Sequence, residues 1–248
     1  MTHATIDLNA DIGEGCDDDA LLAIVTSCNI ACGGHAGDAA SMRTALVSAK
    51  ANGVAAGAHP SYPDRENFGR TKIEMDPDDL RNSLIEQIRA LAVIAVDVGV
   101  AVAHVKPHGA LYNAAAIDDE LARIVLEAST AAAPGARAFG PPSSRLQAQA
   151  ERFGVSFVGE GFADRAYEAD GQLRDRRLGG AILESDAARV SQALNIARDR
   201  QVRTTNGETI VLPARTICLH GDTPGAVASA RLIRDALVQA GVAVRAAS

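Results

Sequence analysis

Short apolar runs recur along the whole chain and are separated by longer segments with helical periodicity. The runs lie near residues 4–8, 28–32, 54–58, 101–105, 136–140, 155–159 and 215–219. Apolar runs of this length predict strands, and strands that alternate with helices indicate βα units in a parallel sheet. About seven such units predict an α/β fold, a distorted seven-stranded parallel (β/α) barrel. An open doubly wound sheet is the alternative.

The clearest helix is predicted for residues 77–98. Asp76 suits the N-cap, Pro77 suits the first helical position, and Gly99 suits the position after the last turn. Between them, leucine and isoleucine recur every three or four residues and form one apolar stripe. Further helices are predicted near 38–52, 118–132, 142–153 and 185–200, and from Thr223-Pro224 to Gly241.

The segments between these elements hold two long irregular stretches, 59–75 and 160–182, both rich in charged and aromatic residues. Loops longer than about 12–15 residues are usually functional or disordered, and we expect active-site loops, with surface crossovers as the alternative. Asn206-Gly207 predicts a β-hairpin before the last strand. Composition does not change along the chain as it would at a linker, so we expect residues 1–248 to form a single barrel domain.

Composition and charge narrow the range of partners. The chain has 248 residues and a formal net charge of −7, which disfavours nucleic acid and anionic membranes as partners. The N-terminus lacks the basic and apolar regions of a signal peptide, and no apolar run is long enough to cross a membrane. The four cysteines lack a CxxC spacing, so we expect reduced thiols and a cytoplasmic location.

Four histidines follow the ends of predicted strands: His35, His59, His108 and His220. In a parallel barrel the loops that leave the strand C-termini converge on one mouth, where active sites are built. We therefore expect these four side chains to meet there. His104 lies within an apolar run, and we predict that it is a hydrogen-bonded core histidine.

The segment 7–14 is the first with polar residues at strand spacing. Alternation along a strand places Asp7, Asn9 and Asp11 on one face, which we expect to line the barrel interior, and Glu14 follows them. Buried polar groups are costly unless they are paired or functional. A solvated edge strand is the alternative.

The loops after the next strands add a glycine pair and a cation. Gly33-Gly34 precedes His35 and permits close backbone approach, whereas Asp38 suits the N-cap of the following helix. Lys106 at a strand end is suited to neutralise a carboxylate or phosphate, or to act as a base with a lowered pKa. The alternative for Lys106 is a buried ion pair with Asp7, Asp11 or Asp222.

Charged residues also gather near the last two strands. Glu160, Asp164 and Arg165 follow one strand end, and we expect them to belong to the site. Arg174, Arg176 and Arg177 suit either an anion site or a solvated loop. His220 and Asp222 flank Gly221, and a carboxylate near a histidine fixes its tautomer.

These residues are compatible with three mechanisms. Histidine and aspartate suit either a divalent metal that activates water or metal-free general acid–base catalysis on an amide. Lysine and arginine suit a site for an acyl-phosphate or a nucleotide phosphate. HxxEH, HExxH and CxxC patterns are absent, so spacing gives the metal little support, and we expect no tightly bound metal. P-loop, GxGxxG and GxSxG patterns are absent as well.

The motifs, taken in order, resemble those of the LamB/YcsF family. They are DLNADIGE (7–14), NIACGGHAGD (29–38), GAHPSYPD (57–64), VKPHGALYN (105–113), FADRAY (162–167) and CLHGD (218–222). The resemblance implies a barrel of the glycoside hydrolase/deacetylase type. It also implies ATP-dependent hydrolysis of the 5-oxo-L-proline lactam to L-glutamate, with ATP as co-substrate together with Mg²⁺, and with partner subunits B and C.

The resemblance is carried onto this chain residue by residue. We expect the catalytic residues to be Asp11, His35, His59, Lys106, His108, His220 and Asp222. We expect the substrate-binding residues to be Asp7, Asn9, Glu14, Glu160, Asp164 and Arg165.

Specific roles follow as hypotheses. Lys106 and Arg165 would hold a carboxylate or phosphoryl group, and Asp11, with His59 or His108, would position and deprotonate water. A metal-dependent deacetylase and a non-catalytic scaffold protein remain the alternatives. The chain departs from the family pattern at Gly34, where phenylalanine is usual, and at Gly179, where proline is expected; either a wider pocket around His35 or a more loosely held His35 would follow from the first.

Overall fold

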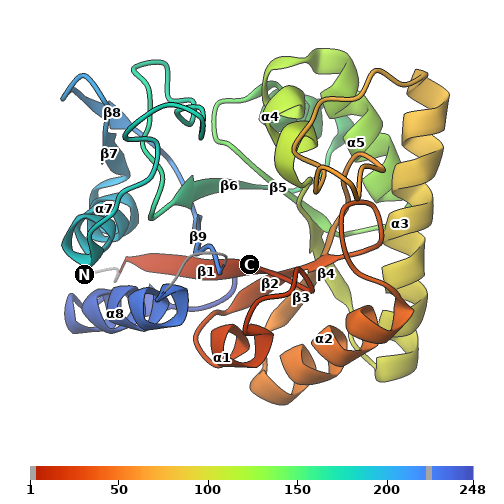
Figure 1. The fold of residues 1–248 in the computed structure, drawn as a ribbon, viewed down its shortest axis with the longest axis horizontal. Helices are drawn as coiled ribbons and strands as arrows, with labels where there is room; N and C mark the ends of the chain where they lie inside the picture. The colour runs from red at the N-terminus through yellow and green to blue at the C-terminus, as the bar shows by residue number, and fades with distance from the viewer. Residues whose placement is uncertain (1–3, 222–224, 248) are drawn as a thin grey trace.

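Seven parallel strands close into a barrel in the computed structural model, which describes residues 4–221 and 225–247 (Figure 1). They pair in the order β1 (Thr5–Ile12), β2 (Ser27–Ala31), β3 (Ala55–His59), β4 (Val102–Val105), β5 (Arg137–Gly140), β6 (Phe157–Phe162) and β9 (Thr216–Cys218). Strand β9 pairs with both β6 and β1, which closes the sheet on itself. The predicted seven-stranded barrel is confirmed, and the open sheet is excluded.

Two smaller pairings lie outside the barrel wall. Strands β7 (Gln201–Arg203) and β8 (Thr209–Val211) form an antiparallel hairpin, and Gly207 adopts a φ of +89° in its turn. The hairpin predicted from Asn206-Gly207 is therefore confirmed. Strand β10 (Ala243–Val244) runs parallel to the start of β1, so the C-terminal segment returns to the first strand.

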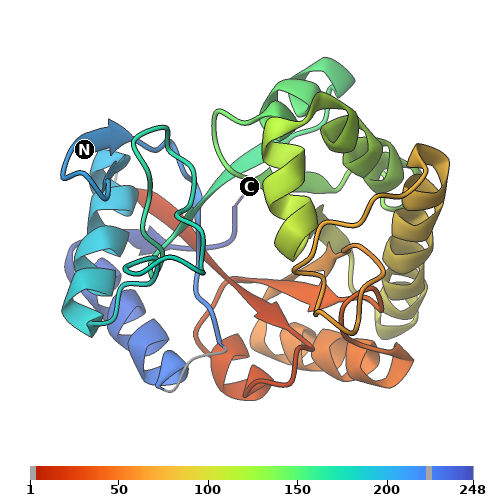
Figure 2. The ribbon, with the colours of Figure 1, turned by 45° about the horizontal axis from the view of Figure 1, so that its top comes forward.

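Helices surround the strands on the outside of the barrel (Figure 2). The longest, α3 (Pro77–Val98), has the predicted limits: the Asp76 side chain accepts a hydrogen bond from the Asp78 amide, and Gly99 adopts a left-handed φ of +73°. The other predicted helices are α2 (Ala39–Asn52), α5 (Asp119–Ala132), α6 (Arg145–Phe153), α7 (Asp186–Asp199) and α8 (Ala226–Gln239). The start predicted for the last one, Thr223-Pro224, lies outside the described residues.

Two short helices were not predicted, α1 (Asp18–Leu22) and α4 (Gly109–Ile117). The first is a single acidic turn capped by Asp17. The second begins directly after His108, at a glycine with a φ of +56°. Both lie at strand C-termini, so they shape the barrel mouth.

The two faces of β1 separate the apolar core from a polar interior. Ile6, Leu8 and Ala10 are fully buried in the apolar layer between strands and helices. Burying apolar surface contributes roughly 25 cal/mol per Å², so this layer supplies most of the stability. Asp7 and Asn9 alternate with these residues and hydrogen-bond across the barrel to strands β2, β6 and β9. The interior is consequently a hydrogen-bonded polar column.

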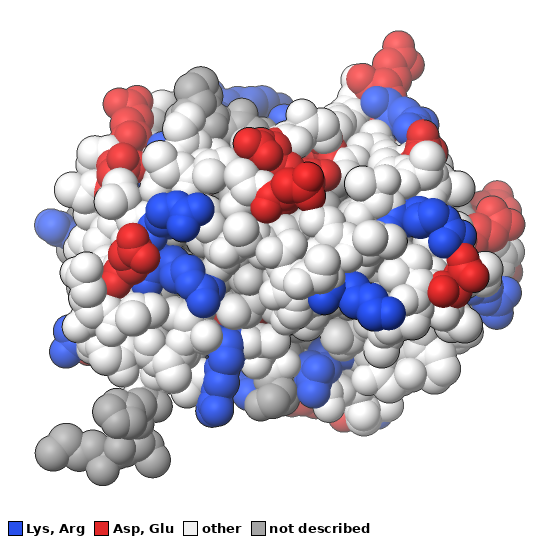
Figure 3. All heavy atoms as spheres, turned by 90° about the horizontal axis from the view of Figure 1, so that it is seen from below, with Lys and Arg blue, Asp and Glu red and all other residues white. Residues whose placement is uncertain are grey.

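The exterior carries mixed charge. On the face in Figure 3, positive and negative side chains are interspersed over a largely uncharged surface. Among the helices of the described residues, none is both long and apolar enough to cross a membrane. Segment 60–76 contains turns, and segment 163–185 contains turns and isolated bridges; both follow strand C-termini and are irregular.

Candidate active site

The polar face of β1 enters the barrel interior, as the alternation predicted. Asp7 lies deepest and accepts hydrogen bonds from the hydroxyls of Thr26, Ser27 and Thr216 at 2.6, 2.9 and 2.6 Å. Burial raises the pKa of Asp7 despite these three donors. Asn9 lies one level above, where its amide donates to Glu160 at 2.9 Å. Asp7 and Asn9 therefore build the floor beneath the mouth.

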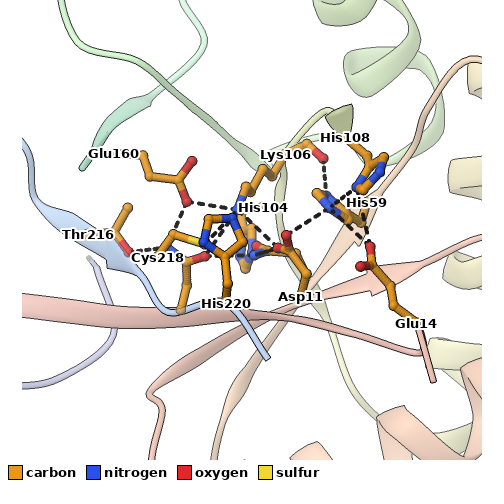
Figure 4. Close-up of polar contacts among 12 residues, drawn as sticks. Asp11, Glu14, His59, His104, Lys106, His108, Glu160, Thr216, Cys218 and His220 are labelled. Carbon is orange, nitrogen blue, oxygen red and sulfur yellow. Dashed lines mark hydrogen bonds and ion pairs between the residues drawn. The ribbon is translucent and has the colours of Figure 1, made fainter. Parts of the chain in front are cut away.

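Lys106 lies at the centre of the mouth, between a carboxylate from β1 and a carboxylate from β6 (Figure 4). Its Nζ is 3.0 Å from Asp11 Oδ1 and 2.9 Å from Glu160 Oε1. It also approaches the side-chain oxygen Oδ1 of Asn9 at 3.4 Å and Cys218 Sγ at 3.3 Å. The ion pair with Asp11, one of the two alternatives for Lys106, is thus present, and Glu160 provides a second partner.

The charges in this group stabilise one another. Burial raises the pKa of Asp11, but the nearby His59 and Lys106 outweigh it and hold that pKa well below its usual range. Burial lowers the pKa of Lys106, and the carboxylate of Asp11 reverses the effect and raises it well above normal. Asp11 is consequently an ionised carboxylate at the mouth.

A second group, Glu14, His35, His59 and His108, adjoins the first through Asp11. His59 Nε2 lies 3.4 Å from Asp11 Oδ2 and 3.0 Å from His108 Nδ1. The Glu14 carboxylate lies 2.7 Å from His35 Nε2 and 3.3 Å from His108 Nδ1. The rings of His35 and His108 stack at 3.6 Å between centroids. Four residues from four separate strand ends therefore converge on one point.

Burial controls the protonation of this histidine group. It lowers the pKa of His35 to about 4 and lowers that of His108 as well. Burial acts in the same direction on His59, but the charge of Asp11 outweighs it and raises the pKa. Burial raises the pKa of Glu14, and the neighbouring His108 and His35 lower it below its usual range. Near neutral pH, Glu14 is an anion facing mainly neutral rings.

His220 lies on the other side of Lys106 and is oriented by two charged residues. Its Nδ1 donates to the Asp164 carboxylate at 2.9 Å, and its Nε2 accepts from Arg176 at 2.9 Å. Burial raises the pKa of Asp164, but the neighbouring His220 lowers it overall. Asp164 thus fixes the tautomer of His220, a role predicted for Asp222, which lies outside the described residues.

Some candidate residues are committed elsewhere. The Arg165 guanidinium donates to the backbone carbonyls of Ala181 and Arg174 and joins the two ends of the 163–185 segment. Asp38 caps α2 through the Ser41 amide, as predicted. His104 is the predicted core histidine: it is buried and donates from Nε2 to Asn29 Oδ1 at 2.7 Å.

Sequence reasoning missed Asn29 and Cys218 as parts of the site. The Asn29 amide bridges the side-chain oxygens of Asn9 and Asp11 at 2.7 and 2.8 Å. Its signal was an asparagine inside an otherwise apolar strand, where a polar side chain requires buried partners. Cys218 is a fully buried thiol beside Lys106, and sequence gives no comparable signal for it.

The glycine at position 34 does not widen the pocket. A Cβ atom at Gly34 would clash with the side chains of Gln87 and Ser61. The Gln87 carboxamide fills this space and hydrogen-bonds both the amide and the carbonyl of Ser61. The expectation of a wider pocket around His35 was therefore wrong, because α3 supplies a side chain where the family pattern has one in the loop.

A closed parallel barrel with carboxylates, histidines and a lysine at its strand C-termini defines an α/β-barrel protein with a polar, enzyme-like mouth. Residues 6–248 match the sequence model of the LamB/YcsF family. The chain belongs to the LamB/YcsF family.

Individual relatives cover nearly the whole chain. It is 49% identical to the A subunit of 5-oxoprolinase from Nocardia farcinica (strain IFM 10152), over 97% of this chain and 98% of the relative. The lactam utilization protein from Thermus thermophilus is 37% identical, with a TM-score of 0.92 over 98% of this chain and 100% of that one.

A more distant structure shares the fold alone. The family 4 carbohydrate esterase from Streptomyces lividans, in complex with acetate, gives a TM-score of 0.50 at 13% identity, over 99% of this chain and 93% of that chain. The predicted glycoside hydrolase/deacetylase type of barrel is consistent with this likeness.

Proposed function

We propose that this chain is one subunit of an ATP-dependent 5-oxoprolinase, which hydrolyses the lactam of 5-oxo-L-proline to L-glutamate. The observation that carries the proposal is the ionised Asp11 carboxylate, held at the barrel mouth by the buried ammonium of Lys106. The similarity to a relative named as the A subunit of 5-oxoprolinase supports the substrate class.

The same name supports a complex, and we propose subunits B and C as its other members.

A lactam is a planar amide and a poor electrophile. Phosphorylation of its oxygen by ATP, with Mg²⁺, would activate the ring carbon: one water adds to that carbon and the C–N bond breaks as the nitrogen takes up a proton. A second water then releases phosphate from the resulting acyl phosphate and gives L-glutamate. Cys28, Cys32 and Cys218 are buried thiols, which supports a cytoplasmic location.

In the proposed reaction, Asp11 accepts a proton from the attacking water. Its Oδ1 is fixed by Lys106 and Asn29, and its Oδ2 faces His59 at 3.4 Å. A carboxylate held in this way is a preorganised general base. Lys106 acts by keeping Asp11 ionised and oriented, because its ammonium is already engaged by Asp11 and Glu160.

We assign the binding of the substrate's carboxylate to Arg176, in preference to Lys106 or Arg165. The Arg176 guanidinium reaches the mouth, where it donates to His220. Guanidinium groups bind carboxylates with two parallel hydrogen bonds. Arg165 instead holds the 163–185 segment through backbone carbonyls.

The test is 5-oxoproline-dependent ATP hydrolysis and glutamate formation by the chain, with and without subunits B and C. Asp11→Asn removes the base with little change in shape, and we expect it to lower turnover about 100-fold or more. Asp38→Asn is the matched control, because asparagine also caps helices, and we expect normal turnover.

Normal lactam turnover by Asp11→Asn in an intact complex would refute the mechanism and favour a scaffold role. Lack of 5-oxoproline-dependent ATP hydrolysis by the complete wild-type complex would refute the function itself.

A further inference from the structure

The group formed by Glu14, His35, His59 and His108 has ligand geometry that the proposed lactam chemistry does not use. One donor atom from each residue lies within 4.8 Å of the others. The four side chains follow strands β1, β2, β3 and β4. A sequence-spacing motif cannot detect such a set, because its members come from four separate loops.

Backbone carbonyls fix the tautomers of two of these histidines. A carbonyl oxygen only accepts, so His59 Nδ1 donates to the Lys106 carbonyl at 2.8 Å. For the same reason His108 Nε2 donates to the Phe68 carbonyl at 3.0 Å. In the neutral rings, the lone pairs of His59 Nε2 and His108 Nδ1 then face each other across 3.0 Å.

While both rings are neutral, the nitrogen pair of His59 and His108 therefore has no donor between its two atoms. The Glu14 Oε1 atom lies 3.3 Å from His108 Nδ1 and 3.7 Å from His59 Nε2, and it adds negative charge to the same point. One shared proton would satisfy a single nitrogen pair, whereas a divalent cation satisfies all three atoms. Histidines that bind metals commonly donate their second N–H to a backbone carbonyl, as both rings do here.

We propose that Glu14, His59 and His108, with His35 as the fourth donor, bind a divalent transition metal of the zinc class. In a tetrahedral zinc site the ligand atoms lie about 3.3 Å apart, since each is about 2.0–2.1 Å from the ion. The separations among Glu14, His59 and His108, at 3.0, 3.3 and 3.7 Å, bracket this value. His35 Nε2 lies 2.7 Å from Glu14 Oε1, so this hydrogen bond opens when His35 becomes the fourth donor. Imidazole nitrogens favour zinc-class ions over magnesium and calcium, which prefer oxygen.

The site adjoins the proposed catalytic carboxylate. Asp11 Oδ2 lies 3.4 Å from His59 Nε2, so an ion on His59 would border the place proposed for the attacking water. The inference does not rest on the lactam reaction, since it follows from the ligand atoms alone. It replaces the expectation of no tightly bound metal, which was based on sequence spacing.

A competing group in the described residues, Asp11, Cys218 and His220, is less suited to a metal. Both ring nitrogens of His220 are engaged, one by Asp164 and one by Arg176. Metals bind the thiolate, and burial raises the pKa of the Cys218 thiol well above its usual value.

The test is metal binding by the full chain after treatment with a chelator. Titration calorimetry with Zn²⁺ should give one site per chain, and Zn²⁺ should raise the melting temperature. Co²⁺ should produce the visible absorption of a four- or five-coordinate site without a thiolate charge-transfer band. Absence of saturable binding, or the presence of a thiolate band, would overturn the proposal.

Variants locate the ion. His59→Gln and His108→Gln should each weaken Zn²⁺ binding about 100-fold or more, because each removes an imidazole ligand. His220→Gln is the matched control and should bind as the wild type does; loss of binding in this variant instead would overturn the assignment. Circular dichroism without metal identifies variants that fail to fold, and Glu14→Gln then provides a further ligand variant. Zinc binding by the chain, together with no lactam turnover by the complete complex, would refute the proposed function and leave this site standing.

Discussion

His104 is a buried histidine that the structure holds neutral among charged neighbours. It donates to Asn29 and stacks on Phe139, with ring centroids 4.0 Å apart. Burial and the nearby Lys106 lower its pKa from 6.5 to about 3. Protonation of His104 would place a second cation beside Lys106 in the buried interior, so folding disfavours the proton.

This exclusion makes stability depend on pH. The unfolded chain binds a proton at His104 below pH 6.5, whereas the folded chain resists it down to about 3. The folded state therefore loses stability as pH falls below 6.5, and at pH 5 the loss from this residue is about 2 kcal/mol. We expect His104→Gln, which keeps a donor for Asn29, to reduce the difference in unfolding free energy between pH 8 and pH 5 by about that amount.

Urea unfolding of both proteins at the two pH values measures this difference. Other buried histidines affect both proteins alike, so the comparison isolates His104. An identical pH dependence in the variant would show that His104 is already protonated in the folded state.

At the residue scale, sequence predicted which side chains enter the mouth better than it predicted their partners. His59 and His108 follow strand ends, and strand polarity alone brings such residues to one edge. The contact between Lys106, which follows β4, and Glu160 on β6 spans the intervening strand β5, so sequence alone does not indicate it. The backbone carbonyl of Phe68, which orients His108, has no sequence signal.

At the element scale, capping residues determined which boundaries could be predicted. Helix α3 has its predicted limits because Asp76, Pro77 and Gly99 mark both ends. Strand β1 extends to Ile12, beyond the apolar run at 4–8, because its interior face is polar. Helix α4 was missed because the residue before its first turn, His108, does not cap it with a side-chain hydrogen bond, and its first residue is a glycine, Gly109.

The segment after β3 is held to the neighbouring loop by one arginine. Arg65 Nη1 donates to the carbonyls of Gly33 and Gly37 at 3.0 and 2.9 Å, on either side of His35. Each such bond is worth about 1 kcal/mol. We expect Arg65→Ala to leave global stability within about 1 kcal/mol of the wild type, because the side chain is exposed, but to increase local opening of both loops roughly tenfold.

Hydrogen exchange of amides in 33–37 and 64–70 measures this opening. Arg43→Ala is the control, since Arg43 forms an exposed ion pair with Asp97 on α3. Equal exchange in the Arg65 variant and the control would show that the arginine does not restrain the loops.

At the scale of the whole molecule, buried hydrogen bonds between Thr216 on β9 and the polar side chains of β1 join the last barrel strand to the first; we call these bonds the polar seam. Strand β9 lies between β6 and β1, and Thr216 on β9 is fully buried. Its hydroxyl donates to Asp7 Oδ2 at 2.6 Å and accepts from the Asn9 amide at 2.8 Å. These bonds connect residues more than 200 positions apart in sequence, so they form only when the barrel closes.

Thr216→Val tests how much this seam contributes, because valine keeps the shape and removes the hydroxyl. The change leaves Asp7 without one donor and Asn9 without one acceptor in a space that excludes water. We expect a loss of about 3 kcal/mol in the free energy of unfolding, since unpaired buried polar groups cost about 1–3 kcal/mol each. Thr216→Ser keeps the hydroxyl and removes only a methyl group, so we expect it to cost about 1 kcal/mol. Equal losses for the two variants, measured by urea unfolding at neutral pH, would show that packing rather than the hydrogen-bonded seam holds β9 against β1.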